Sequence, residues 1–128
     1  MEMKGINHVN IAVSDLDKSQ KFYSEVFGMK EAYRIPQFRF LTCGKDLLTL
    51  QIGEPINAES NHFGFDVNNK DELNKWKDWM KEKNIPIDSF RVNKGSAGIY
   101  FRDPDGNRIE IYFVEGNWNE ERDHWVYW

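Results

Sequence analysis

The sequence predicts an α+β fold built from two tandem β-α-β-β-β modules, which form a curved sheet cleft with the helices outside. The segment at 7–13 (NHVNIAV) is echoed 54 residues later at 61–67 (NHFGFDV), and each copy places a histidine at the same phase of an alternating strand. Each copy is followed by a segment of helical periodicity and then by three short alternating segments, so the order of elements repeats. An α+β sandwich without duplication is the alternative, in which the similarity is coincidental.

The composition indicates one globular domain over residues 1–128. Its net charge of −4 provides no basic surface for nucleic acid. The single cysteine, Cys43, excludes an intrachain disulfide and suits a reducing cytoplasm. No apolar signal region precedes the first strand, and no run approaches the ~18 apolar residues of a membrane span, so we expect a cytoplasmic protein without a membrane partner.

The first module is expected at about residues 5–53. In its first strand, at 5–13, apolar residues face one way while His8 and Asn10 face the other. Ser14 is expected to cap a helix with an apolar stripe, and Gly28 is a natural stop for that helix because glycine adopts the left-handed conformation easily. Three further strands follow at 30–35, 38–43 and 46–53, and a linker at 54–60.

The second module is expected at about residues 60–114, with a C-terminal tail at 115–128. Its first strand carries His62, and the segment that starts at Asn69 opens a helix closed by Asn84 and Pro86. The turn at 103–107 (DPDGN) joins the last two strands, because proline fixes φ and glycine permits a positive φ. The three strands after the helix are expected at 87–92, 97–102 and 108–114.

Strand alternation places an unusual number of polar side chains on the sheet face opposite the helices. These residues are His8, Asn10, Thr49, Gln51, His62, Tyr100, Arg108, Glu110 and Tyr112. Two imidazoles and a carboxylate meeting in a cleft favour a divalent cation, and three protein ligands leave positions open for water and substrate, as in catalytic sites. Taken singly, each histidine is more often a hydrogen-bonded surface residue, and Glu110 a solvated carboxylate.

The strand that begins at Asn7, the helix segment at 21–28, the second histidine His62 and the segment 100–110 (YFRDPDGNRIE) together resemble the vicinal oxygen chelate superfamily, over nearly the whole chain. Its members include glyoxalase I, extradiol dioxygenases, fosfomycin-resistance enzymes and metal-free bleomycin-binding proteins. The resemblance implies that His8, His62 and Glu110 bind one divalent metal ion, with Mn2+, Fe2+, Zn2+ and Ni2+ all left open. It also implies a substrate that chelates the metal through adjacent oxygens, and a homodimer.

Departures from the patterns of individual members leave the reaction open. With Phe40 matched to Phe101, Thr49 falls where glyoxalase I enzymes carry an acidic ligand. Fosfomycin enzymes usually carry Thr or Cys at the position of Asn10. They also carry cationic groups where this chain has Phe90 and Asn119; the substitute cations that the sequence offers are Arg91, Lys94 and Arg122. The histidine that dioxygenases place near this strand is missing from 91–95.

The sequence therefore predicts a divalent-metal-dependent enzyme of this superfamily acting on a small oxygen-chelating substrate, as a lyase, isomerase, transferase or dioxygenase. Tyr100 is the expected catalytic hydrogen-bond donor. Four further residues are expected to line the substrate site: Asn10, Thr49, Gln51 and Tyr112. Two alternatives remain: a fosfomycin-type enzyme that opens an epoxide, and a metal-free protein that binds a planar molecule through its aromatic side chains.

Overall fold

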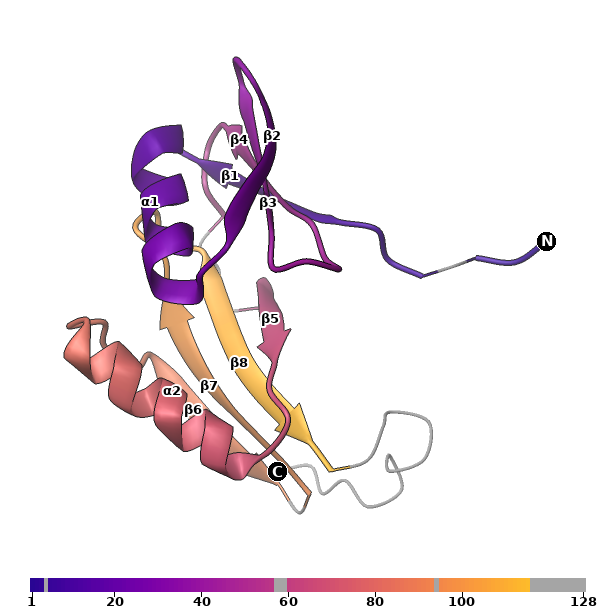
Figure 1. Ribbon diagram of the computed structural model, residues 1–128. Helices are drawn as coiled ribbons and strands as arrows, with labels where there is room; N and C mark the ends of the chain where they lie inside the picture. The colour runs from indigo at the N-terminus through magenta and orange to yellow at the C-terminus, as the bar shows by residue number, and fades with distance from the viewer. Residues whose placement is uncertain (4, 57–59, 94, 116–128) are drawn as a thin grey trace. The chain divides into compact units, whose positions relative to one another are not determined.

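The computed structural model describes residues 1–3, 5–56, 60–93 and 95–115, and its elements follow the predicted order (Figure 1). The chain divides into two compact units. The first unit comprises Met1–Asn61 together with the loop Asp103–Asn107. The second comprises His62–Arg102 and the described residues from Arg108 onward.

The described residues of the first unit form one helix and one four-stranded sheet. Its elements are β1 (Val9–Val13), α1 (Leu16–Phe27), β2 (Lys30–Ile35), β3 (Phe38–Thr42) and β4 (Leu48–Ile52). The strand order is β1-β4-β3-β2, in which β1 runs parallel to β4 and the other pairs are antiparallel. The expected first strand at 5–13 is shorter than predicted, because pairing with β4 starts at Val9.

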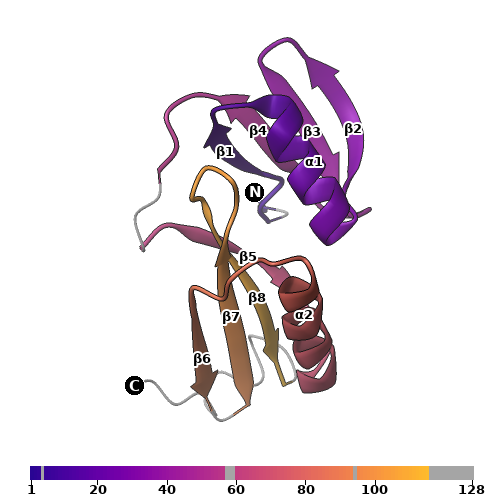
Figure 2. The ribbon, with the colours of Figure 1, turned by 90° about the vertical axis from the view of Figure 1, so that its left-hand side faces the viewer.

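The second unit repeats this arrangement, which confirms the predicted duplication of elements. It contains β5 (His62–Asp66), α2 (Lys70–Glu82), β6 (Ser89–Asn93), β7 (Ser96–Arg102) and β8 (Arg108–Val114). The strand order is β5-β8-β7-β6, again with one parallel pair, β5 with β8 (Figure 2). A parallel pair requires a crossover, and α2 supplies it here as α1 does in the first unit.

The helix ends follow local side-chain chemistry, with one correction to the predicted caps. Asp15, not Ser14, caps α1, since its side chain accepts a hydrogen bond from the Lys18 backbone N–H at 3.0 Å. The Ser14 hydroxyl instead donates to Asp105, a contact across 91 positions that local pattern does not reveal. Gly28 ends α1 in the left-handed conformation, as predicted.

The predicted cap of α2 is confirmed. The Asn69 side chain accepts from the Glu72 N–H at 2.9 Å, and Glu72 reaches back to the Asn68 N–H at 2.8 Å. These two bonds satisfy donors that a helix N-terminus otherwise leaves without partners. Asn84 follows the helix with a φ of 58°, a left-handed conformation that asparagine tolerates better than most residues.

The apolar side of each sheet packs under its helix, as the alternation predicts. Leu48 and Leu50 are buried in the first unit, and Ile109 and Ile111 in the second. Val9 and Ile52, at opposite ends of the parallel pair, are 36% and 42% exposed, so the predicted apolar face is incompletely covered at its ends.

The loop Asp103–Asn107 is part of the first unit and packs against α1. The Tyr23 hydroxyl donates to Asp103 Oδ2 at 2.8 Å, and the Asn107 side-chain amide donates to the Ala12 carbonyl at 3.0 Å. Tyr23 is fully buried, and burial, followed by the charge of Asp103, raises its pKa well above the usual value. The predicted turn thus also anchors the helix. Among the described residues, no helix is long and apolar enough to span a membrane.

Candidate functional site

His62 and Glu110, two of the three predicted metal ligands, meet in the second unit. They lie on adjacent parallel strands, where Glu110 pairs with Gly64, two residues beyond His62. Side chains two residues apart on a strand share a face, so both point to the side opposite α2. The His62 Nε2 atom lies 3.4 Å from Glu110 Oε1. The imidazole is about one-third exposed, whereas the carboxylate is almost fully buried.

Two glycines provide the space that the Glu110 side chain occupies. A Cβ atom added at Gly98 would collide with the Glu110 carboxylate, and one at Gly64 would lie 3.3 Å from the Glu110 backbone oxygen. A glycine inside a strand often marks such a close approach. The carboxylate therefore lies directly over the β7 backbone, in a position that any larger residue at 98 would obstruct.

A guanidinium group balances the buried carboxylate. Arg91 Nη2 on β6 lies 3.2 Å from Glu110 Oε2, so the two carboxylate oxygens face different partners, His62 and Arg91. Because the Arg91 side chain is 46% exposed, its guanidinium contacts both the buried charge and solvent. This pairing offsets part of the cost of burying Glu110.

Tyr100 packs among the same charged groups. Its ring meets the His62 ring edge-on at 5.2 Å between centroids, and the Arg108 guanidinium lies 3.9 Å from the ring centroid. Burial raises the pKa of the Tyr100 phenol, and the charge of Glu110 raises it further, while Arg91 and Arg108 oppose the shift. The net direction keeps the phenol protonated at neutral pH, as a hydrogen-bond donor must be.

Tyr112, predicted to line the substrate site, lies beside this group. It follows Glu110 by two residues on β8, pairs with Gly98 on β7, and its ring would lie 3.2 Å from a Cβ atom at that glycine. The second unit therefore brings together four of the predicted site residues: His62, Tyr100, Glu110 and Tyr112.

The other predicted substrate-lining residues meet in the first unit and bond to one another. The Asn10 side-chain amide donates to Gln51 Oε1 at 3.1 Å, and the Thr49 hydroxyl donates to Asn10 Oδ1. Thr49 is buried, and it lies 3.4 Å from the Val9 carbonyl oxygen. This cluster contains no carboxylate.

His8, the third predicted metal ligand, is exposed and immediately precedes β1. Its Nδ1 atom lies 3.0 Å from Asn7 Oδ1. His8 belongs to the first unit, whereas His62 and Glu110 belong to the second, so their grouping around one ion stays a prediction. Within either unit, the described residues form no group of three His, Cys, Asp or Glu side chains suited to a metal.

Strand pairing corrects one detail of the internal alignment. Phe40 lies opposite Thr49, and Tyr100 lies opposite Glu110. Phe40 therefore corresponds to Tyr100, not to Phe101, because the second hairpin is one residue longer. The match of Thr49 with Glu110 is nevertheless correct: Asn10 pairs with Thr49 as Gly64 pairs with Glu110.

Two residues of the site are missed or underestimated by sequence reasoning. Gly98 belongs to no predicted motif, although a glycine between β-forming residues at 97–101 is a recognised signal of close backbone approach. Arg91 is predicted only as a substitute cation, and its contact with Glu110 depends on strand pairing that sequence does not specify. Three positions that the sequence analysis considers lie outside the described residues: Lys94, Asn119 and Arg122.

Comparison with known proteins identifies the family. The model of the Glyoxalase/Bleomycin resistance protein/Dioxygenase superfamily matches residues 5–111. The chain belongs to this superfamily. The predicted resemblance and the two-module α+β fold are thereby confirmed.

Among curated members of the superfamily, the chain is 31% identical to metallothiol transferase FosB of Staphylococcus epidermidis, over 88% of this chain and 83% of that protein. It is 30% identical to glutathione transferase FosA of Serratia marcescens, over 86% of this chain and 81% of that protein. Among solved structures, the fosfomycin resistance protein FosX of Listeria monocytogenes, complexed with Mn(II) and sulfate, shares the fold. It has a TM-score of 0.78 and 23% identity, over 96% of this chain and 100% of that chain.

Proposed function

We propose that this chain is a divalent-metal-dependent enzyme acting on a small anionic substrate, with His8, His62 and Glu110 as the metal ligands. The observation that carries the proposal is the 3.4 Å approach of His62 Nε2 to Glu110 Oε1 above a glycine-lined backbone. An imidazole nitrogen and a carboxylate oxygen are suitable donors for Mn2+, Fe2+ or Zn2+. Both are already held on one face of the same sheet.

The metal would act as a Lewis acid toward a substrate oxygen. The protein groups around it have roles that follow from their charges. Tyr100, kept protonated, donates a hydrogen bond to a substrate oxygen. Arg91, half exposed and already beside the carboxylate, binds an anionic substituent of the substrate. These roles favour a substrate that carries a compact oxyanion.

The reaction that we favour is the opening of an epoxide in a small phosphonate such as fosfomycin by a thiol. Sulfur bonds to an epoxide carbon as that carbon–oxygen bond breaks, and the released alkoxide oxygen takes up the proton that the thiol has lost. The names of the relatives, a metallothiol transferase and a glutathione transferase, support this choice. Fosfomycin enzymes carry a cationic residue where this chain has Phe90, and Arg91 would take over its role of binding the phosphonate.

Metal titration of the purified protein tests the first part of the proposal. We expect Mn2+ to bind the wild type and to raise its melting temperature, because an ion that binds only the native state stabilises it. His62→Ala should bind Mn2+ at least about 100-fold more weakly, since it removes a ligand. Asp78→Asn, which removes an exposed carboxylate from α2, is the control and should bind normally.

Phosphorus NMR of fosfomycin with glutathione or cysteine tests the second part. We expect a conversion of fosfomycin that requires both metal and thiol. Arg91→Ala should slow this conversion while the variant keeps its affinity for the metal. Metal binding without turnover of fosfomycin would reject the epoxide reaction and keep the metalloenzyme. A protein that neither binds metal nor shifts its melting temperature would favour the metal-free binding alternative.

A further inference from the structure

A groove of about 280 Å³ lies in the second unit between α2 and the edge of its sheet. Its wall on the helix includes Lys70, Leu73, Asn74 and Lys77, and its wall on the sheet includes Phe90, Val92, Ala97 and Ile99. Residues 97 and 99 alternate with Gly98 and Tyr100 along β7, so the groove is on the helix side of the sheet. Its apolar wall therefore lies on the opposite side of the sheet from His62 and Glu110, although Arg91 and Gly98 also border the groove.

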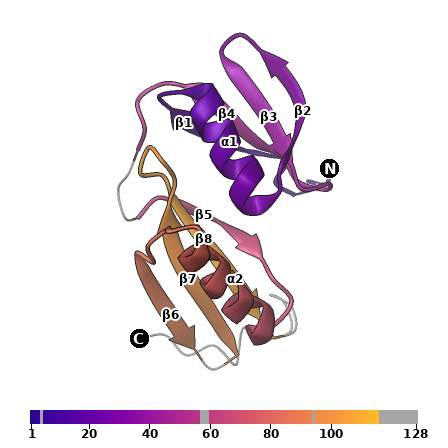
Figure 3. The same ribbon diagram turned by 60° about the vertical axis from the view of Figure 1, so that its left-hand side comes forward.

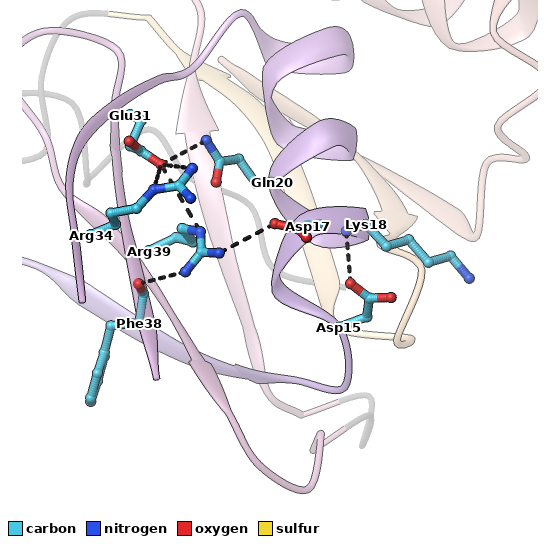
Figure 4. Close-up of polar contacts among 8 residues, drawn as sticks. All are labelled: Asp15, Asp17, Lys18, Gln20, Glu31, Arg34, Phe38 and Arg39. Atoms are coloured by element: carbon cyan, nitrogen blue, oxygen red, sulfur yellow. Dashed lines mark hydrogen bonds and ion pairs between the residues drawn. The ribbon is translucent and has the colours of Figure 1, made fainter. Parts of the chain in front are cut away.

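The equivalent position in the first unit is filled by a polar network (Figure 4). Arg39 Nη2 on β3 lies 3.2 Å from Asp17 Oδ1 on α1, and the Gln20 amide donates to Glu31 Oε1 on β2 at 3.1 Å. Arg34 adds a second charge to Glu31, at 2.6 Å. Helix and edge strand are thus bridged directly in the first unit.

In the second unit an apolar residue replaces the arginine of this network, whereas the helix keeps an acidic residue: counted from the caps, Asp17 corresponds to Asp71. Counted from the caps Asp15 and Asn69, Gln20 corresponds to Asn74. By strand pairing, Arg39 corresponds to Ile99, because the former pairs with Leu50 and the latter with Ile111. In Figure 3, α2 lies along β7 and β8 while β6 lies to one side of the helix. The groove follows this uncovered side.

The sheet side of the groove leaves large apolar side chains in solvent. Phe90 is 71% exposed and Val92 is 62% exposed, both on β6. Adjacent exposed apolar residues beside a groove are a common mark of a binding surface. The helix side adds two lysines, Lys70 and Lys77, so the groove combines apolar surface with positive charge.

We propose that the C-terminal segment of the same chain, residues 117–128, docks in this groove. The segment (NWNEERDHWVYW) has three tryptophans, one tyrosine and one valine, together with three acidic residues and one arginine. Its aromatic residues match the apolar wall, and its excess of acidic residues matches Lys70 and Lys77. The segment also starts close to the groove, because Glu115, the last described residue, lines it.

The length of the segment is sufficient. Twelve extended residues reach ~40 Å, whereas the 13-residue helix α2 is about 20 Å long, so the segment can follow the groove along the whole helix. Docking would cover Phe90 and Val92, the two exposed apolar side chains of β6.

Cross-linking within the full chain tests the proposal. In a Cys43→Ser background, which removes the single cysteine, one cysteine is appended after Trp128 and a second replaces Lys77. The matched control replaces Lys75 instead, which points about 200° around the helix from Lys77 and does not line the groove. With a short dimaleimide at low protein concentration, we expect the Lys77→Cys chain to cross-link internally about tenfold faster or more, because docking raises the effective concentration of its partner.

A second pair of variants tests the surface itself. Val92→Asp places a carboxylate in the groove against an acidic segment, and should slow cross-linking of the Lys77→Cys chain to the rate of the Lys75→Cys chain. Tyr33→Asp changes a residue of equal exposure on β2, 63% against 62%, and should leave the rate unchanged. Equal rates for the two lysine positions would overturn the proposal. Cross-links predominantly between chains would overturn it in favour of a second copy as the occupant.

Discussion

The two units share one arrangement of strands and helix but place different chemistry at equivalent positions. In the first unit, Asn10 lies opposite Thr49 across the parallel pair; in the second, Gly64 lies opposite Glu110. Asn10 and Thr49 bond to each other, whereas Gly64 leaves room beside a carboxylate. The same position is therefore occupied in the first unit by two neutral side chains that hydrogen-bond to each other, and in the second unit by an ionisable group.

The neighbouring hairpin strand shows the same difference. Phe38 pairs with Gln51 in the first unit, and Gly98 pairs with Tyr112 in the second. Only the glycine allows a carboxylate to lie across the strand backbone. A duplicated fold can therefore keep its backbone while one copy holds the charged group and the other fills the same space with side-chain amides.

Removing the carboxylate of Glu110 should weaken metal binding more than any other single substitution in either unit. Glu110→Gln keeps the shape but removes the charge, and we expect Mn2+ affinity to fall about 100-fold or more, equivalent to ~2.7 kcal/mol. Thr49→Val, the matched change in the first unit, should leave the affinity within about twofold, because a neutral hydroxyl that bonds to Asn10 is a poor ligand. Isothermal titration calorimetry distinguishes them, and similar losses in both variants would remove the proposed asymmetry.

Filling the space under Glu110 should come next. Gly98→Ala forces the carboxylate off the β7 backbone, and we expect a loss of about 1–3 kcal/mol in the free energy of unfolding. Gly53→Ala is the control, because its added Cβ would meet the Ala12 side chain at an ordinary 3.5 Å. Urea denaturation followed by circular dichroism measures both, and equal stability of the two variants would show that the close approach is not needed.

Features governed by local period were predictable from the sequence, whereas those governed by pairing across the sheet were not. Alternation correctly placed His62, Glu110 and Tyr112 on one face, because the direction of a strand side chain depends only on its position. The cap Asn69 and the stop Gly28 were predictable for the same reason: their bonds are made within a few residues.

The contacts that sequence reasoning missed join residues far apart in the chain. Arg91 reaches Glu110 only because β6, β7 and β8 are adjacent in a particular register. The neighbours of Ser14 predict a cap, but its hydroxyl bonds to Asp105 instead, and Asp15 takes its place. Neither partner could be selected from local preference.

A smaller effect on stability is expected at Tyr23 of α1. Its equivalent in α2, when both are counted from the helix caps, is Lys77. Tyr23→Phe removes the bond to Asp103 and should cost about 1 kcal/mol. The raised pKa of Tyr23 means that the folded state keeps a proton that the unfolded chain loses near pH ~10. Above that pH, Tyr23 ionises more readily in the unfolded chain than in the folded protein. The free energy of unfolding of the wild type should therefore fall as the pH rises further.

The phenylalanine variant should lack this part of the alkaline decline. Lys77→Ala leaves Tyr23 in place and should keep the alkaline decline of the wild type. Urea melts of the three proteins at neutral and alkaline pH provide the measurement. An identical alkaline decline in wild type and Tyr23→Phe would mean that other groups account for it.

The exposed ion pair of α1 should have the smallest effect. Lys21 Nζ lies 4.0 Å from Glu25 Oε1, and both side chains are more than half exposed. Solvent screens such a pair, so Lys21→Ala should change the free energy of unfolding by no more than ~0.5 kcal/mol. Arg39→Ala is the informative contrast, because the Arg39 side chain is only 12% exposed and joins β3 to Asp17 on the same helix. If thermal melting shows equal losses for both, the polar network does not bridge helix and sheet, and the contrast with the open groove of the second unit loses its energetic basis.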